Sequence, residues 1–300
     1  MIHGKAVNAS VWLQDLKLLI KYRVLLANVV PVFTGFWLAL YFTGSLFGEY
    51  VTEFFCTMIG TTLVMAGALM LNNWYEADID AVMDRTKQRP TVTGHFSLRS
   101  ILAAGILTSL SGFGILLFTT GETIVYTFIG WFAYVVLYTI WSKRRYTMNT
   151  IIGSLSGAVT PLMGWAAVDS ALHVIPISLF AILFIWQIPH TLATAMKKCD
   201  EYSRAGVRML PVVYGFAMTK RQMAVYVACL LPIPFWMVSL GNVYVFVLTV
   251  LNIVWLGLVL YGFYAKDDLK WAHQNFLFSV NYLMVVFLLP IILTIPSFPF

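Results

Sequence analysis

The basic residues of this 300-residue chain are confined to five short stretches, and this confinement limits the fold more than any other feature. All 19 Lys and Arg residues lie within 1–23, 76–99, 142–148, 197–221 or 265–275, and the segments between these stretches are strongly apolar. Cytoplasmic loops of membrane proteins collect Lys and Arg. Because alternate loops are basic, the pattern predicts an all-α, polytopic membrane protein with nine transmembrane helices and a cytoplasmic N-terminus.

Each predicted helix has about 20 mainly apolar residues, enough to cross the hydrocarbon core of a bilayer. We place the helices at 24–43, 54–74, 99–119, 122–141, 149–168, 173–195, 222–240, 243–264 and 276–296. This arrangement leaves Pro296–Phe300 on the outer face. The chain is therefore expected to be one integral membrane domain, 1–300. A cytoplasmic interfacial segment covers 1–23, and two long cytoplasmic loops cover 76–98 and 197–221.

The composition supports this class of protein. Hydrophobic residues make up 60% of the chain and charged residues 11%, against roughly 25% charged residues in a soluble domain. Positive-inside topology and anionic lipid account for the net charge of +6, so nucleic acid is not an expected partner and membrane lipid is. The three cysteines lack disulfide or metal spacing, and 1–23 shows no cleavage pattern of a removed signal peptide.

The loop after the second predicted helix carries the strongest chemical signal. If that helix continues past the membrane edge, acidic and amide side chains recur every four residues along one face, at Asn72, Glu76, Asp80 and Asp84. Like charges at this spacing repel, so the stripe predicts a bound cation. Mg²⁺ prefers oxygen ligands and is commonly shared between one or two carboxylates and substrate phosphates. Basic side chains for those phosphates follow directly, at Arg85, Lys87 and Arg89.

Other polar features have two interpretations each. The loop 197–221 repeats the mixture of charges more weakly, and on its own it is better explained as a solvated positive-inside loop. Asp78, two residues off the stripe, is either a ligand or a cap on a bent helix end. The small residues between Gly153 and Gly164 indicate tight helix packing or, alternatively, a groove for a flat or extended ligand.

The run Asn72 to Pro90, NNWYEADIDAVMDRTKQRP, resembles the first acidic motif of the UbiA superfamily of membrane prenyltransferases. It looks most like the protoheme IX farnesyltransferase (heme O synthase) branch. Further similarities to that branch are YTMNTIIGSLSGAVTPLMGW at 146–165, WQIPH at 186–190 and AGVRMLPVV at 205–213. The four stretches occur in the expected order over about 70–221, and their combination is highly specific. The resemblance implies a UbiA-type helical bundle.

The sequence departs from the family at some motif positions. In the pattern NDxxDxxxD, Asn73 and Glu76 stand where many relatives have Asp. The second family motif, DxxxD in quinone-prenylating members, aligns with Lys198–Tyr202 and lacks both terminal acids. Arg208 stands where relatives of the heme branch often carry Pro.

The resemblance implies a membrane-bound enzyme that transfers a farnesyl group from farnesyl diphosphate to a vinyl group of heme B. Water completes the hydroxyethylfarnesyl side chain, and the product is heme O. Heme B is then a substrate, and Mg²⁺ is the cofactor. The implied metal ligands are Asn72, Glu76 and Asp80, which with Arg85 form the implied catalytic set. The implied substrate-binding residues are Asn73, Asp78, Asp84, Lys87, Arg89, Lys143, Asn149, His190, Lys197, Lys198, Asp200 and Glu201.

His190 lies inside a predicted span, which makes it a candidate functional residue. Its imidazole could ligate heme iron or orient a propionate. The alternative is a histidine that only hydrogen-bonds between helices beside Pro189.

Three alternative functions compete with farnesyl transfer to heme. A sister prenyltransferase acting on a quinone precursor would be expected to keep the second acidic motif. A secondary transporter would be expected to place its acids near the bilayer midplane, whereas here they cluster at one surface. A structural membrane subunit leaves the acidic stripe unexplained. We therefore expect a plasma-membrane enzyme whose active site faces the cytoplasm, with a heme-pathway or terminal-oxidase protein as a candidate partner.

Overall fold

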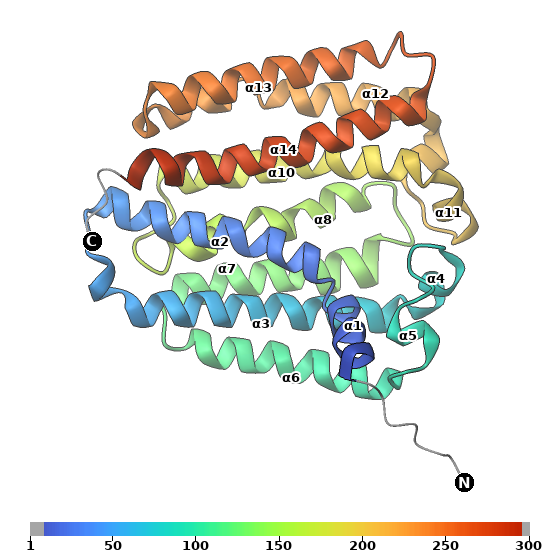
Figure 1. The fold of residues 1–300 in the computed structure, drawn as a ribbon, viewed down its shortest axis with the longest axis horizontal. Helices are drawn as coiled ribbons and strands as arrows, with labels where there is room; N and C mark the ends of the chain where they lie inside the picture. Colours follow the sequence, from blue (N-terminus) through green and yellow to red (C-terminus); the bar gives the residue numbers. More distant parts are fainter. Residues whose placement is uncertain (1–8, 296–300) are drawn as a thin grey trace.

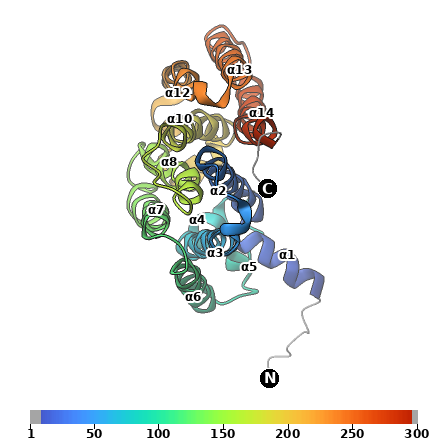
Figure 2. The ribbon, with the colours of Figure 1, turned by 90° about the vertical axis from the view of Figure 1, so that its left-hand side faces the viewer.

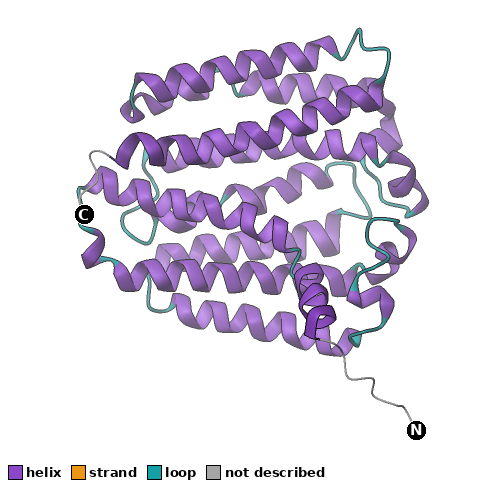
Figure 3. Cartoon of the chain, in the orientation of Figure 1, coloured by secondary structure: helices purple, strands orange, loops and turns teal. Residues whose placement is uncertain are grey.

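The computed structural model describes residues 9–295, and these residues form helices and loops without a β-strand (Figure 3). Pro296–Phe300, predicted on the outer face, lie outside this range. The helices are α1 Ala9–Leu19, α2 Tyr22–Thr43, η1 Phe47–Glu49, α3 Val51–Tyr75, α4 Ala77–Val82, α5 Pro90–Thr93, α6 Leu98–Leu116, α7 Gly121–Phe132, η2 Ala133–Ser142, α8 Asn149–Ala158, α9 Thr160–Trp165, α10 Val174–Lys197, α11 Cys199–Arg204, α12 Leu210–Cys229, η3 Ile233–Leu240, α13 Asn242–Tyr261 and α14 Asp268–Thr294.

Eight helical segments within the described residues are long and apolar enough to cross a membrane. The fifth predicted span, 149–168, does not form one such helix, because it is divided into α8 and α9. Pro161 lacks an N–H and cannot bond the carbonyl of Gly157. The Thr160 hydroxyl donates to that carbonyl instead (2.6 Å). The all-helical membrane fold is thus confirmed, and the count of nine spans stays a prediction.

The break between α8 and α9 lies beside a very close helix crossing. A Cβ atom on Gly164 would lie 1.9 Å from the carbonyl oxygen of Val32 on α2, and one on Gly35 would lie 2.1 Å from the carbonyl oxygen of Pro161. Only glycine permits this approach of two backbones. The tight packing predicted for the small residues of this segment is therefore confirmed.

The long helices run side by side, and the short helices α4, α5 and α11 gather at one end of the bundle (Figure 1). Seen along the bundle, α10, α12, α13 and α14 lie on one side and α3, α6 and α7 on the other, with α2 and α8 between them (Figure 2). The α2–α14 contact includes hydrogen bonds from Thr34 Oγ1 to Phe287 O (3.1 Å) and from Trp37 Nε1 to Thr294 Oγ1 (2.8 Å). Toward the end with α4 and α11, α2 and α14 diverge (Figure 1).

The second long loop is shorter than predicted. We expected 197–221 to be loop, but α12 begins at Leu210, with a local break at Gly215 (φ 76°). Lys220 is buried inside α12, where its ammonium group donates to Gly262 O (2.6 Å) and pairs with Asp268 (2.5 Å). A lysine with these partners can lie inside a helix. The start of α12 was therefore predicted too late in the sequence, because the prediction used the positions of charged residues alone.

The two loops that follow α3 and α10 pack on each other. An apolar cluster joins Ile79 and Met83 of the first loop to Val207 and Met209 of the second. At its edge Arg204 approaches Asp84, with 3.4 Å between Nη2 and Oδ2. This contact covers the end of the bundle where the predicted site residues lie.

Candidate active site

The site begins where α3 ends. Asn72 lies in the last turn of α3, and Glu76 follows at a break with φ −99° and ψ 12° before the short helix α4. Both side chains are buried. The Asn72 amide nitrogen donates to Glu76 Oε1 (2.8 Å) and to Thr139 Oγ1 of η2 (2.9 Å). These two bonds fix the amide so that its oxygen Oδ1 faces away from both acceptors.

Glu76 and Lys143 form a buried ion pair. The Lys143 ammonium group donates to Glu76 Oε2 at 2.6 Å, and it lies over the ring of Tyr138. Burial alone would raise the pKa of Glu76, but the charges of Lys143 and Lys21 offset that effect and the pKa is lowered. Burial lowers the pKa of Lys143, yet the charge of Glu76 outweighs it and the pKa is raised. Both groups therefore remain charged at neutral pH.

Asp80 has its own cation. Its carboxylate accepts a hydrogen bond from Arg89 Nη1, and both side chains are buried. Arg89 directly precedes α5, and the Thr86 hydroxyl donates to the backbone carbonyl of Asp80 (3.0 Å). The loop between α4 and α5 thus folds back so that Arg89 returns to the carboxylate nine residues before it. Of the three basic residues predicted to follow the acidic stripe, Arg85, Lys87 and Arg89, one is therefore buried against a stripe carboxylate, namely Arg89.

A third cation enters from the α1–α2 junction. Lys21 donates from its ammonium group to Asn72 Oδ1. Burial lowers the pKa of this lysine well below its ordinary value, with further effects from the charges of Arg89, Glu76, Lys143 and Asp80. We call this group of Lys21, Asn72, Glu76, Asp80, Arg89 and Lys143 the buried cluster.

Several residues of the predicted stripe and its downstream loop lie outside the buried cluster. The prediction of one continuous acidic stripe is wrong at Asp84, because α4 ends at Val82 and Met83 is extended. Asp84 is exposed and pairs with Lys87 (2.9 Å). Arg85 is exposed as well. Asp78 is exposed at the surface end of α4 and is held by both terminal nitrogens of Arg144 (2.8 and 2.7 Å).

Two buried asparagines position backbone rather than face the cluster. Asn73 Nδ2 donates to Leu19 O at the end of α1 (2.6 Å). Asn149 Nδ2 donates to the carbonyls of Lys143 (3.3 Å) and Arg208 (3.2 Å). Asn149 therefore ties the loop that carries Lys143 to the segment that precedes α12.

The loop that follows α10 contributes none of the six residues of the buried cluster. Lys198 pairs with Glu201 (2.7 Å), and Asp200 is exposed. Lys197 turns toward α14, where its ammonium group contacts His273 Nδ1 (2.8 Å) and lies over the ring of Phe276. The structure therefore leaves these four charged residues as an outer group beside α14 and α11.

His190 lies about two turns before the end of α10, between α10 and α14. Its ring stacks on Trp186 with 4.6 Å between centroids. Ser279 Oγ on α14 lies 2.7 Å from His190 Nδ1 and donates its single proton to Phe276 O (2.7 Å). The tautomer with the proton on Nδ1 satisfies both contacts, because Nδ1 then donates to Ser279 Oγ, and it leaves Nε2 with a lone pair.

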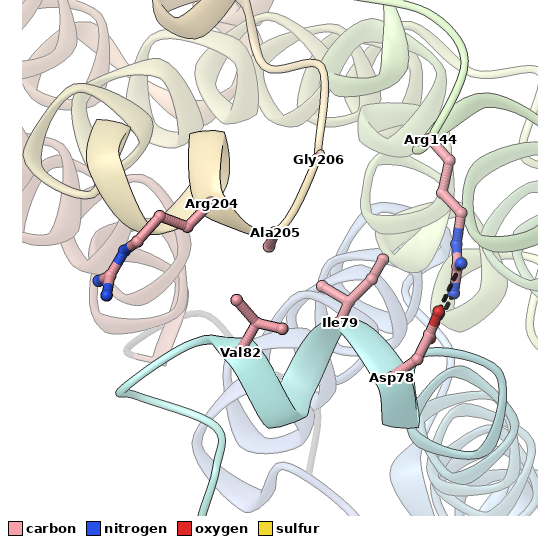
Figure 4. Close-up of a pocket in the computed structure, with 7 residues that line it drawn as sticks. All are labelled: Asp78, Ile79, Val82, Arg144, Arg204, Ala205 and Gly206. Carbon is pink, nitrogen blue, oxygen red and sulfur yellow. Dashed lines mark hydrogen bonds and ion pairs between the residues drawn. The ribbon is translucent and has the colours of Figure 1, made fainter.

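A small surface cavity lies beside the buried cluster. Its volume is about 250 Å³, and Figure 4 shows Asp78 and Arg144 on one side of it and the α11 end on the other. It is lined by Asp78, Ile79, Val82, Arg144, Arg204, Ala205 and Gly206. This volume is below the roughly 300–1,000 Å³ of pockets that enclose drug-sized ligands.

The donor set suits a metal shared with a substrate. The residues from 9 to 295 contain no group of three or more His, Cys, Asp or Glu side chains that could hold a metal ion alone. The buried cluster offers two carboxylates and one amide oxygen. Mg²⁺ usually takes one or two carboxylates and completes its shell with water and substrate phosphates. The residues present fit that mode of binding.

Lys21 and Thr139 belong to the site but were not predicted from the sequence. Thr139 lies in the π-helix η2, and π-helical turns often occur at functional sites. A single threonine within an apolar segment forms no sequence pattern that would have identified it. Lys21 directly precedes the first apolar segment. Lys21 and Lys143 both lie next to the end of an apolar segment, at the edge of the membrane. This shared position is the signal that could have identified Lys21.

Residues 28–281 match the UbiA prenyltransferase family. A relative from Oceanobacillus iheyensis named protoheme IX farnesyltransferase is 52% identical over 285 residues, which cover 95% of this chain and 91% of the relative. One of the same name from Bacillus mycoides is 52% identical over 283 residues, covering 94% and 92%.

Solved structures share the fold. A digeranylgeranylglyceryl phosphate synthase superposes with a TM-score of 0.77 at 16% identity, covering 95% of this chain and 99% of that one. A UbiA homolog from Archaeoglobus fulgidus bound to GPP and Mg²⁺ gives 0.70 at 13% identity, covering 92% and 99%.

Proposed function

The chain belongs to the UbiA prenyltransferase family, and from this premise we propose that it transfers a farnesyl group from farnesyl diphosphate to a vinyl group of heme B. The product is heme O. The 52% identity to protoheme IX farnesyltransferases over 95% of the chain supports heme B as the acceptor. The chain is a membrane-bound prenyltransferase.

The buried cluster is the single structural observation that carries the proposal. Three cationic side chains, Lys21, Lys143 and Arg89, surround two carboxylates and one amide. With Lys21 in its charged form, the cluster has one excess positive charge. A diphosphate brings negative charge and a divalent cation offsets most of it, so the assembled site approaches neutrality. A buried site of this kind favours a metal–diphosphate pair over either partner alone.

The reaction begins with cleavage of the bond between C1 of the farnesyl chain and the diphosphate oxygen, which keeps the electron pair. Mg²⁺, held by Asn72, Glu76 and Asp80, would supply Lewis-acid stabilisation of that leaving group. Lys143 and Arg89 position the two carboxylates and direct positive charge toward the same region. Fixed charges in a buried site need no reorganisation when the leaving group develops its charge.

Two aromatic rings beside Lys143 are the proposed stabilisers of the allylic cation. Tyr134 and Tyr138 are neighbours on η2, with ring centroids 5.7 Å apart, and Lys143 lies over the Tyr138 ring. Aromatic faces stabilise a nearby cation. The heme vinyl group then attacks C1 to form the new carbon–carbon bond, and water adds to the resulting cation with loss of one proton.

His190 is the proposed contact with heme. Ser279 engages Nδ1 and leaves the lone pair of Nε2 available for iron. The rings of Trp186 and Phe276 flank the imidazole and hold its plane. The basic loops support a site that faces the cytoplasm from the plasma membrane. A heme-pathway or terminal-oxidase protein would then be the partner that delivers or receives heme.

An acceptor comparison tests the function. The purified chain is incubated with farnesyl diphosphate and Mg²⁺, together with equal amounts of heme B and a hydroxybenzoate quinone precursor, and products are identified by mass spectrometry. We expect farnesylated heme and no prenylated hydroxybenzoate. Prenylated hydroxybenzoate with unmodified heme would instead identify a quinone-pathway prenyltransferase.

A further inference from the structure

Lys21 has an unusual backbone conformation. With φ 46° and ψ 54° it is the one non-glycine residue with positive φ in the described part of the chain. It joins α1 to α2, and a side chain with a Cβ is disfavoured in this left-handed region. Such a conformation persists only where surrounding contacts hold it.

Two neighbouring asparagines of α3 supply those contacts. Asn73 Nδ2 donates to Leu19 O (2.6 Å), which fixes the end of α1. Asn72 Oδ1 accepts from the Lys21 ammonium group, which fixes the side chain. The last turn of α3 therefore determines where the junction lies and where its lysine points.

The accepting atom is also the oxygen that the proposed function assigns to the metal. An ammonium group and a divalent cation cannot share Asn72 Oδ1, because they would repel each other at close range. The lysine stem is flexible and its three donors rotate freely, so the ammonium group can leave this oxygen without a change in the backbone. Metal and diphosphate arriving together would give it a new anionic partner.

We propose that Lys21 is a diphosphate-binding residue whose ammonium group occupies Asn72 Oδ1 until the metal–diphosphate pair enters. This inference rests on the proposed function of the buried cluster. On entry of the pair, Lys21 moves from the amide oxygen to a phosphate oxygen. Metal alone must displace the lysine without compensation, whereas metal with diphosphate gives the lysine a stronger bond than the one it loses.

A purely structural lysine would behave differently. If Lys21 only anchors the α1–α2 junction, its removal should weaken every ligand to a similar degree through loss of order. The proposed role predicts opposite effects on two ligands, because the lysine competes with one and binds the other.

The experiment compares Lys21→Met and Lys21→Gly with the wild type and with Lys17→Met. Lys17 lies one turn away on α1, is exposed, and loses the same charge. Lys21→Gly also removes the ammonium group but accepts the positive φ, so it controls for backbone strain. Binding of Mn²⁺ alone, and of the unreactive farnesyl thiodiphosphate with Mn²⁺, is measured by calorimetry on the purified full chain.

Both Lys21 variants should bind Mn²⁺ alone more tightly than the wild type and bind farnesyl thiodiphosphate with Mn²⁺ about tenfold or more weakly, the effect of one charge-assisted hydrogen bond. Lys17→Met should match the wild type for both ligands. Equal weakening of both ligands, or no change relative to Lys17→Met, would overturn the proposal. A wild type that binds neither ligand would contradict the proposed function and this inference with it.

Discussion

Each carboxylate of the buried cluster neutralises one cation, and its loss would leave that cation buried without a partner. Glu76→Ala leaves Lys143 without its carboxylate partner, and Asp80→Ala does the same to Arg89. We expect either change to lower kcat by a factor on the order of 100 or more, comparable with the loss of other electrostatic stabilisers. Heme O formed per minute by the folded variants is the measurement.

Two further variants serve as controls for this prediction. Asp169→Ala removes an exposed acid far along the sequence from the cluster and should retain wild-type turnover. Glu76→Asp preserves the charge and should keep most of the activity. Near-normal turnover of both Glu76→Ala and Asp80→Ala would show that the cluster has no part in the chemistry.

His190 and Ser279 provide the second residue-scale prediction. Ser279→Ala removes the acceptor that keeps the proton on Nδ1, so the ring can exchange tautomers and Nε2 is no longer held as a ligand. Heme B affinity should fall and the optical spectrum of bound heme should change, whereas farnesyl diphosphate binding should not. Ser279→Thr keeps the hydroxyl and should restore the spectrum. A wild-type spectrum in Ser279→Ala would remove this hydrogen bond from heme recognition.

Site residues that lie close together in the sequence were predicted, whereas a site residue that the fold brings in from a distant segment was not. Asn72, Glu76 and Asp80 were found because they recur at helical spacing. Lys21 lies 51 residues from Asn72, and no local pattern records that contact. Asp84 fits the same spacing but is exposed, because packing of Met83 into an apolar cluster turns the chain away.

At the scale of helices, the α2–α9 crossing determines how closely the central elements pack. Gly164→Ala would place a methyl group 1.9 Å from the backbone oxygen of Val32. A backbone carbonyl group, unlike a side chain, cannot change rotamer to relieve this clash. We expect a loss of about 1–3 kcal/mol, the usual cost of overpacking, seen as a lower thermal midpoint in detergent. Gly114→Ala on α6 meets open space and should leave the midpoint unchanged or slightly raised. Equal midpoints for the two variants would contradict the close crossing.

Helix positions were predicted well wherever an apolar run ends at a loop. The start of α3 was predicted within three residues and that of α10 within one. The errors arose where tertiary contacts replace local signals. Lys220 was predicted to lie in a loop because it is charged. In the structure it lies inside α12, where it binds Gly262 and Asp268. The division of α8 from α9 depends on Pro161 and on the hydroxyl of Thr160.

For the whole molecule, the distribution of charge predicts one orientation in the membrane. The basic loops should lie in the cytoplasm, and an odd number of spans puts the two termini on opposite sides. A reporter that is active only outside the cytoplasm, fused after Phe300, should therefore be active. Activity of a cytoplasm-dependent reporter at the same position, with none from the external one, would overturn the predicted topology.

The buried cluster is proposed to ionise farnesyl diphosphate so that heme B is alkylated. The most direct test follows heme B, heme O and released diphosphate together, by mass spectrometry and a diphosphate assay, in the purified chain with farnesyl diphosphate and Mg²⁺. We predict one heme O and one diphosphate for each heme B consumed. Diphosphate release without heme O, or heme B left unchanged by active protein, would contradict it.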